Sequence, residues 1–351
     1  MAKFRVKYQP QSLCQLLKLQ ISKQHWTSFG TKELMKRKLR KYNEDLEEQQ
    51  RKHNKEVFES YIWKGTWERV HNNLDHFCLP LDCLQELKTV AKNMGQVFCE
   101  WIYDMYSKTS HSFVQACLDH IRWTKDGVID SVETLKSVYY STYGANGSWH
   151  HLHLKLLYEY CLEECIIDHY EKDKDFLERY EIARYRESTI LPIYWIRRMQ
   201  NRLESFYLGF KHYLQRVNLS NFSYDNTESL DYNLAYYFIT IDKHFAAVYF
   251  YGLLSKHEKI RIITDLVEDN VQIPNETAVY LWKQALFFGI DAYTDKILKY
   301  ASVLMYLRHW PQVDLLTNFF ERLAKFDLDR AISLFENINF FHSFIISKCN
   351  T

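Results

Sequence analysis

The chain has 351 residues, 47% of them hydrophobic and 25% charged, which is the composition of a folded globular protein rather than a disordered one. Its 9 glycines and 5 prolines are too few for the many tight turns of a sandwich or barrel, so the composition argues against an all-β fold. The net charge is only +1, which excludes a uniformly basic or acidic chain.

The first predicted helix follows Pro10 and carries apolar side chains at helical spacing: Leu13, Leu16, Leu17 and Ile21. A break at 29–30 ends this helix. Thr31 resembles an N-cap, and a long polar helix is expected over 31–61. Its stretch 47–56 contains no apolar residue, so we expect that part to project into solvent or to bridge parts of the molecule.

The net charge conceals a basic N-terminal segment. Residues 1–41 hold eleven lysines and arginines but a single acidic residue, Glu33. Five of the basic residues form a block: Lys36, Arg37, Lys38, Arg40 and Lys41. Such a block can attract nucleic acid or an anionic surface, and it can equally dock on the acidic remainder of its own chain.

Helices continue through the middle of the chain. Pro80 suits a first helical turn, and an apolar stripe over 81–102 follows it. The next apolar stripe covers 113–121, and the clearest break lies at 143–148. Further helices are expected over 149–170, over the charged segment 171–188 and from Pro192 to about 210.

Residues 218–228 form the best candidate linker, because they are polar and rich in turn-forming residues. Beyond it, breaks recur every 13–18 residues, near Asp242, Ser255, 272–274, Gly289, Pro311 and Asp327. This spacing is typical of stacked helical hairpins. A weak internal match at an offset of 69 residues agrees with twice the period of two-helix repeats, whereas another match at 43 does not.

These patterns predict an all-α protein: a helical body followed by a stack of helical hairpins that resembles a short α-solenoid. The expected organisation is a basic helical N-terminal arm over 1–62, a helical domain over 63–217 and a helical-hairpin repeat domain over 228–351.

Eight cysteines are present without any C-x-x-C pair, and a chain of this length can bury a core without disulfides. The charged start of the chain is not followed by an apolar signal region. The most apolar stretches, such as 245–254, span about ten residues, whereas a membrane-spanning helix needs about 20. We therefore expect an intracellular, cytoplasmic chain with reduced thiols and without a membrane span.

The strongest metal-like cluster consists of Cys161, Cys165 and His169, which would share one helix face at i, i+4 and i+8. Three successive turns of one straight helix cannot surround an ion, because the outer two residues lie ~12 Å apart along its axis. The alternative is that the two cysteines are small core residues. We therefore expect no metal and no cofactor here.

Motifs of the common catalytic sites are missing. The chain contains no G-x-S-x-G, no H-E-x-x-H and no glycine-rich phosphate loop. Aromatic residues make up 16% of the chain and lie mostly within apolar helical stripes, which favours core packing over base stacking. The sequence therefore does not predict an enzyme.

Short motifs along the chain resemble those of a large family of uncharacterised all-helical proteins expanded in arachnid genomes. They are Pro10-Gln11-Ser12-Leu13-x-x-Leu16, Leu79-Pro80-x-x-Cys83-Leu84 with Trp101 downstream, the helix 152–170, and Leu307-x-x-Trp310-Pro311. Some family members look like degenerate ankyrin-type helical repeats. The resemblance implies a helical fold, but it implies no site, since the family has no assigned activity. The polar helix near 32–61 departs from the family pattern.

The sequence thus predicts a non-enzymatic protein–protein interaction scaffold whose protein partner it does not identify. The alternative is binding to nucleic acid or to an anionic surface through the basic block. The predicted helical architecture and the missing catalytic motifs favour the scaffold function, although a fold alone does not determine function.

Overall fold

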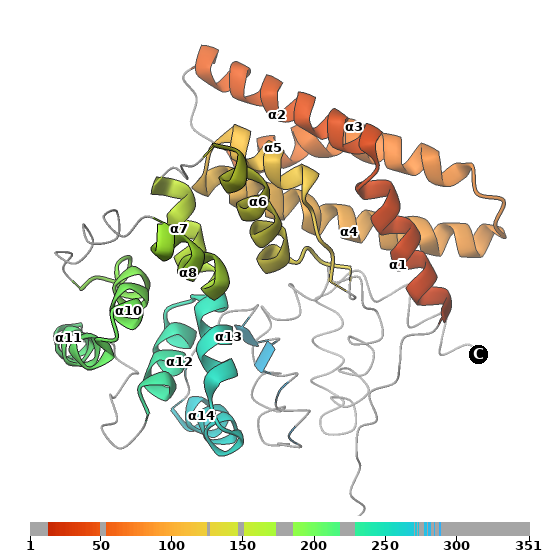
Figure 1. Ribbon diagram of the computed structural model, residues 1–351. Helices are drawn as coiled ribbons and strands as arrows, with labels where there is room; N and C mark the ends of the chain where they lie inside the picture. Colours follow the sequence, from red (N-terminus) through yellow and green to blue (C-terminus); the bar gives the residue numbers. More distant parts are fainter. Residues whose placement is uncertain are drawn as a thin grey trace, which may run out of the picture. The chain divides into compact units, whose positions relative to one another are not determined.

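The computed structural model describes residues 13–49, 54–124, 127–146, 151–172, 185–217 and 229–269, with separate positions between 271 and 288. These residues contain thirteen helices and no β-strand, apart from one isolated antiparallel bridge between Trp123 and Ile129 (Figure 1). The predicted all-α fold is confirmed. Within the same residues, no helix combines the length and the apolar character that crossing a membrane requires.

The chain divides into two compact units between Gly147 and Ser148. The first unit contains α1 (Leu13–Trp26), α2 (Phe29–Gln49), α3 (Lys55–Asp75), α4 (Leu81–Lys108), α5 (His111–Asp119) and α6 (Ser131–Asn146). The second contains α7 (His151–Glu159), α8 (Glu163–Lys172), α10 (Ile190–Met199), α11 (Leu203–Arg216), α12 (Leu230–Thr240), α13 (His244–Leu253) and α14 (Lys256–Glu268). The division falls inside the domain expected over 63–217, and the boundary expected after residue 62 falls inside α3. The linker expected at 218–228 lies outside the described residues.

A tryptophan cluster forms the core of the first unit. Trp26 of α1 is fully buried, and its indole N–H donates to the carbonyl oxygen of Ala91 on α4 at 2.8 Å. Its ring stacks on Trp63 and Trp67 of α3, with centroids 5.9 and 6.5 Å away, and meets Phe98 of α4 edge-on. One side chain therefore holds α1 against both α3 and α4.

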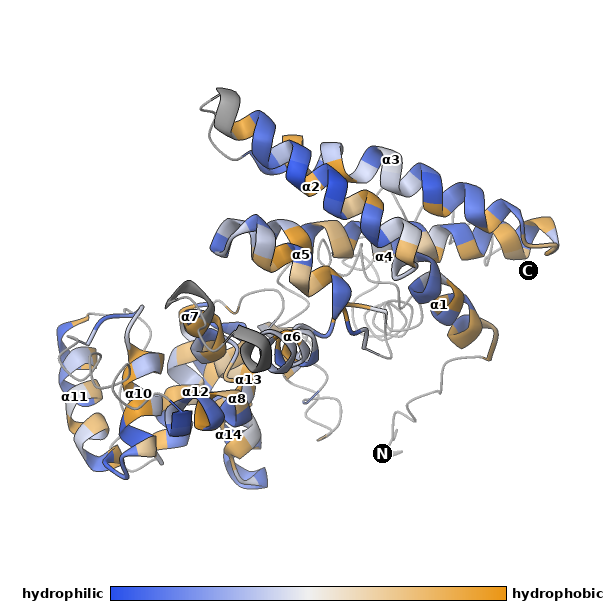
Figure 2. Ribbon diagram, turned by 45° about the horizontal axis from the view of Figure 1, so that its top comes forward, coloured by the Kyte–Doolittle hydropathy of each residue, from blue (hydrophilic) through white to orange (hydrophobic). Residues whose placement is uncertain are grey.

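The single long helix expected over 31–61 is wrong. α2 ends at Gln49, and Asn54 caps α3 by accepting a hydrogen bond from the backbone N–H of Val57 at 3.2 Å. Tyr42 and Phe58 then lie with their ring centroids 5.0 Å apart, although one straight helix would place them about 24 Å apart along its axis. Burying the apolar residues of both halves against each other requires the reversal. Figure 2 shows that hydrophilic residues predominate along α2 and α3.

The apolar stripes predicted after Pro80 and over 113–121 are confirmed. Leu87, Ala91, Met94, Phe98 and Ile102 of α4 are fully buried. They recur every three to four residues along a 28-residue helix, so one face of α4 supplies much of this core.

Two helices expected in the second unit are each split by a residue with left-handed backbone. Cys161 (φ 50°) separates α7 from α8, and Asn201 (φ 55°) separates α10 from α11. The continuous helices expected over 149–170 and 192–210 are therefore wrong. Asp242 (φ 60°) ends α12 where a break was predicted. Of the helix expected over 171–188, residues 173–184 lie outside the described part.

The second unit is organised around α12, whose residues 232–239 are all buried. A helix that is buried on every side lies at the centre of its unit. Its Tyr237 ring contacts Phe210 of α11, and its Phe238 ring stacks on Phe250 of α13. Tyr232 and Tyr236 donate hydrogen bonds to Asp265 and Asp269, of which Asp265 lies on α14.

Candidate functional site

The basic block lies on α2, and part of it is used by the protein itself. Lys36 forms ion pairs with Asp119 at 2.7 Å and with Glu33 at 3.0 Å. Lys38 donates to the backbone carbonyl oxygen of Tyr61 at 2.6 Å and lies 5.2 Å from the centroid of the same tyrosine ring. Both lysines therefore fasten α2 to neighbouring helices.

The other three members of the block, Arg37, Arg40 and Lys41, are exposed. They lie on α2, and the charges of α2 and α3 together balance, because α2 carries six basic and five acidic residues and α3 carries three and four, while Arg51 and Lys52 lie between the helices in the sequence. The block is thus a local patch of positive charge among many acidic residues of the same two helices, and these acidic residues weaken its long-range attraction to polyanions.

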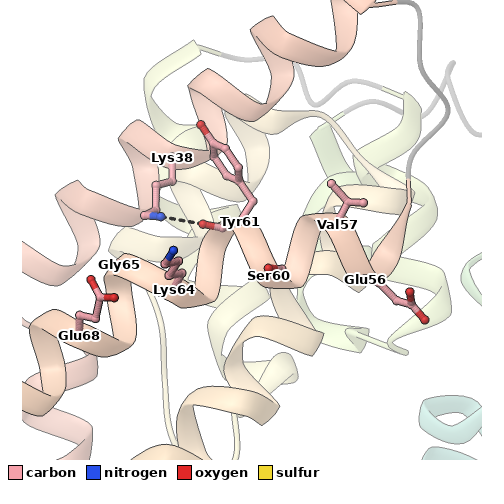
Figure 3. A pocket seen from close by; sticks show the side chains of 8 residues that line it. All are labelled: Lys38, Glu56, Val57, Ser60, Tyr61, Lys64, Gly65 and Glu68. Atoms are coloured by element: carbon pink, nitrogen blue, oxygen red, sulfur yellow. Dashed lines mark hydrogen bonds between the residues drawn. The ribbon is translucent and has the colours of Figure 1, made fainter.

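A shallow groove of about 680 Å³ runs along this hairpin (Figure 3). Seven of its eight lining residues belong to α3, and Lys38 reaches in from α2. The lining residues are Lys38, Glu56, Val57, Ser60, Tyr61, Lys64, Gly65 and Glu68. The lining thus combines two lysines, two glutamates and a serine with the apolar Val57 and the Tyr61 ring.

Gly65 gives the groove its shape where the two helices approach. A Cβ atom at this position would lie 3.3 Å from Cε of Lys38, tighter than an ordinary contact. The missing side chain lets Lys38 lie across α3 and reach the Tyr61 carbonyl. The groove is thus lined by the backbone at Gly65 and by the Tyr61 ring, and the Lys38 amine lies over this ring.

The three weak metal candidates do not form a site. Cys161 lies in the turn before α8, and only Cys165 and His169 share that helix, so the single helix face expected for all three is wrong. All three side chains are buried. Burial raises the pKa of the Cys161 thiol, so this group stays protonated in the metal-free protein. Among the described residues, no three His, Cys, Asp or Glu side chains are grouped to hold an ion.

An ionic network in the second unit was not predicted from the sequence. The Arg198 guanidinium of α10 donates to Glu163 of α8 and, at 2.6 Å, to the hydroxyl of Tyr249 on α13. Tyr249 in turn donates to the other Glu163 oxygen at 2.6 Å. Burial, partly offset by Arg198, raises the pKa of the neighbouring Tyr194 to about 12, so this phenol stays protonated. The network joins three helices, and its members are 35 to 86 residues apart, so no local signal reveals it.

Comparison of the chain with protein-family models, with curated proteins and with solved structures finds no match. The resemblance to the arachnid family therefore stays a prediction. The fold and the groove define the chain as an all-helical protein with a shallow groove on its first unit.

Proposed function

We propose that the chain is a non-enzymatic scaffold that binds a helical segment of a partner protein in the α2–α3 groove. The observation that carries this proposal is the groove lining. Val57, Tyr61, Lys64 and Glu68 recur at intervals of three to four residues, so they form one face of α3. Val57 is 55% exposed although it is apolar.

The chemistry of this face defines the partner. Val57 and the Tyr61 ring offer apolar contact, and tyrosine is enriched where interfaces concentrate their binding energy. Lys64 is exposed and makes no ion pair with any described residue. An amphipathic partner helix with an aliphatic or aromatic anchor and an acidic residue one turn away fits this arrangement.

The second unit supports a scaffold architecture. Three side-chain hydrogen bonds join residues 33 positions apart: Tyr232 to Asp265, Tyr236 to Asp269, and His244 to Thr277. A constant offset of about 33 residues is the period of ankyrin-type two-helix repeats. We propose that α12–α14 begin a short solenoid-like stack, a fold that presents extended surfaces to partners.

Photocrosslinking tests the groove. A benzoylphenylalanine placed at Val57 is expected to crosslink a discrete partner in an extract of cells that express the protein. Lys64→Glu should abolish that product, because it repels the acidic residue of the partner. The same photoreactive residue at Leu208, which is 58% exposed on α11, is the control. Identical products from both positions, or a product that survives Lys64→Glu, would contradict the proposal.

A second candidate function rests on the exposure of Arg37, Arg40 and Lys41, which share one face of α2. These residues would contact the phosphates of nucleic acid or of an anionic surface. Fluorescence anisotropy with duplex DNA and single-stranded RNA at ~50 mM salt tests this function. Binding that is lost when all three residues are changed to glutamine would favour it, and no binding at this salt removes it.

A further inference from the structure

A charged cavity of about 350 Å³ lies within the second unit, and none of its lining residues belongs to the groove of the first unit. Its walls come from the second half of α7, the turn before α10, the first turn of α10 and Lys243 at the start of α13. Three basic side chains, Lys155, Arg186 and Lys243, converge there from three separate segments. Leu191 and Pro192 add an apolar wall.

The two acidic residues of the cavity are already paired. Glu159 lies 3.5 Å from Lys155, and Glu187 lies 3.8 Å from Lys243. The Arg186 guanidinium makes no hydrogen bond or ion pair with any residue that the structure describes. Only the backbone groups of Arg186 are bonded there, to Thr189 and Ile190. Among the residues that the structure describes, the cavity therefore holds one more basic than acidic side chain, and none of them pairs with the Arg186 guanidinium.

The backbone around the cavity also favours a negatively charged ligand. α10 and α13 both begin at its edge, and neither start has a side-chain capping hydrogen bond. The partial positive charge of a helix start favours an anion nearby. This contribution adds to the three cationic side chains and does not replace them.

We infer that this cavity binds a small phosphate monoester, with the phosphate on Arg186 and Lys243 and the organic part against Leu191 and Pro192. A guanidinium matches two phosphate oxygens with parallel N–H donors, and a monoester is largely dianionic at pH 7. The two carboxylates disfavour larger polyanions, because a long chain of phosphates would have to pass close to Glu159 and Glu187.

Calorimetric titration of the full chain with phenyl phosphate, at a constant ionic strength of about 0.1 M, tests the inference. Saturable one-to-one binding of phenyl phosphate is expected, and phenol should not bind. Arg186→Gln should weaken binding by at least about tenfold, which corresponds to about 1.4 kcal/mol. Arg186 is exposed, so this variant should fold normally, which far-UV circular dichroism verifies.

Arg216→Gln is the matched control, because Arg216 is an exposed arginine of the same unit outside the cavity. It should bind phenyl phosphate as the unchanged chain does. The inference is overturned if phenyl phosphate does not bind, or if Arg186→Gln and Arg216→Gln bind it equally. The groove variant Lys64→Glu should leave this binding unchanged, so the site and the scaffold proposal succeed or fail separately.

Discussion

Gly95 and Gly65 both lie inside helices of the first unit, but their surroundings differ. A Cβ on Gly95 would lie 1.9 Å from the ring of Trp26, which is fully buried between α3 and α4. A Cβ on Gly65 would meet only the end of the Lys38 side chain, at 3.3 Å. A rigid buried ring cannot move aside, whereas a flexible lysine can, so the same added methyl group has different consequences.

We expect Gly95→Ala to lower the free energy of unfolding by about 1–3 kcal/mol relative to Gly65→Ala, the range typical of overpacking. In a helix, alanine is more favourable than glycine by about 1 kcal/mol, and this gain applies at both sites. It therefore cancels in the difference between the two variants. Urea denaturation followed by tryptophan fluorescence measures the difference. Equal midpoints for the two variants would show that Trp26 does not pack on Gly95.

The start of α12 in the second unit is fixed by Ser229, which also links this helix to α14. Ser229 accepts a hydrogen bond from the backbone N–H of Tyr232 at 3.1 Å and so caps α12. The same hydroxyl donates to Glu258 of α14 at 2.7 Å. One small side chain therefore starts α12 and also ties it to α14.

Ser229→Ala is expected to destabilise the protein by about 1 kcal/mol at pH 7, the usual cost of losing an N-cap. The hydrogen bond from Ser229 is the main cause of the lowered pKa of Glu258, so this carboxylate contributes stability above pH 4.5. That contribution is lost as pH falls through the lowered pKa. The difference between Ser229→Ala and the unchanged chain should therefore shrink between pH 7 and pH 3.

Denaturation midpoints at both pH values measure this effect. Ser229→Thr is the control, because threonine keeps the hydroxyl and is an accepted N-cap. A pH-independent difference would show that Glu258 takes no part.

Across the whole molecule, the cysteines that the structure describes range from exposed to buried, with Cys83 between these extremes. Cys14 and Cys78 are exposed, whereas Cys99 and Cys117 of the first unit are buried. Cys161 and Cys165 of the second unit are buried as well. Burial raises the pKa of the thiols of Cys99, Cys117 and Cys161, so these groups stay protonated and unreactive in the folded protein.

Iodoacetamide at pH 8 should therefore modify Cys14 and Cys78 in the folded protein and the four buried cysteines only after denaturant is added. Residue-resolved mass spectrometry measures the order. Since the described residues include two buried thiols in each unit, the same experiment follows the opening of each unit separately. Rapid modification of Cys117 or Cys161 without denaturant would contradict the burial described here.

At the scale of the site, the sequence identified one member of the groove. Lys38 was predicted as part of the basic block, but the seven lining residues from α3 were not. They line a groove only because α2 reverses onto α3, and the sequence predicted one uninterrupted helix there. The Arg198 network and the charged cavity likewise join segments that are far apart along the chain.

The sequence by itself determined the class of this protein, because a chain poor in glycine and proline and rich in apolar stripes of helical period buries its core between helices. It also located the faces of α4 and α5 and the break at Asp242. Only the tertiary structure decided where Asn54, Cys161 and Asn201 divide longer helical patterns. Each of these residues is compatible locally with a helix and with a turn. The helix ends there because the reversal of the chain buries apolar side chains against another part of the protein.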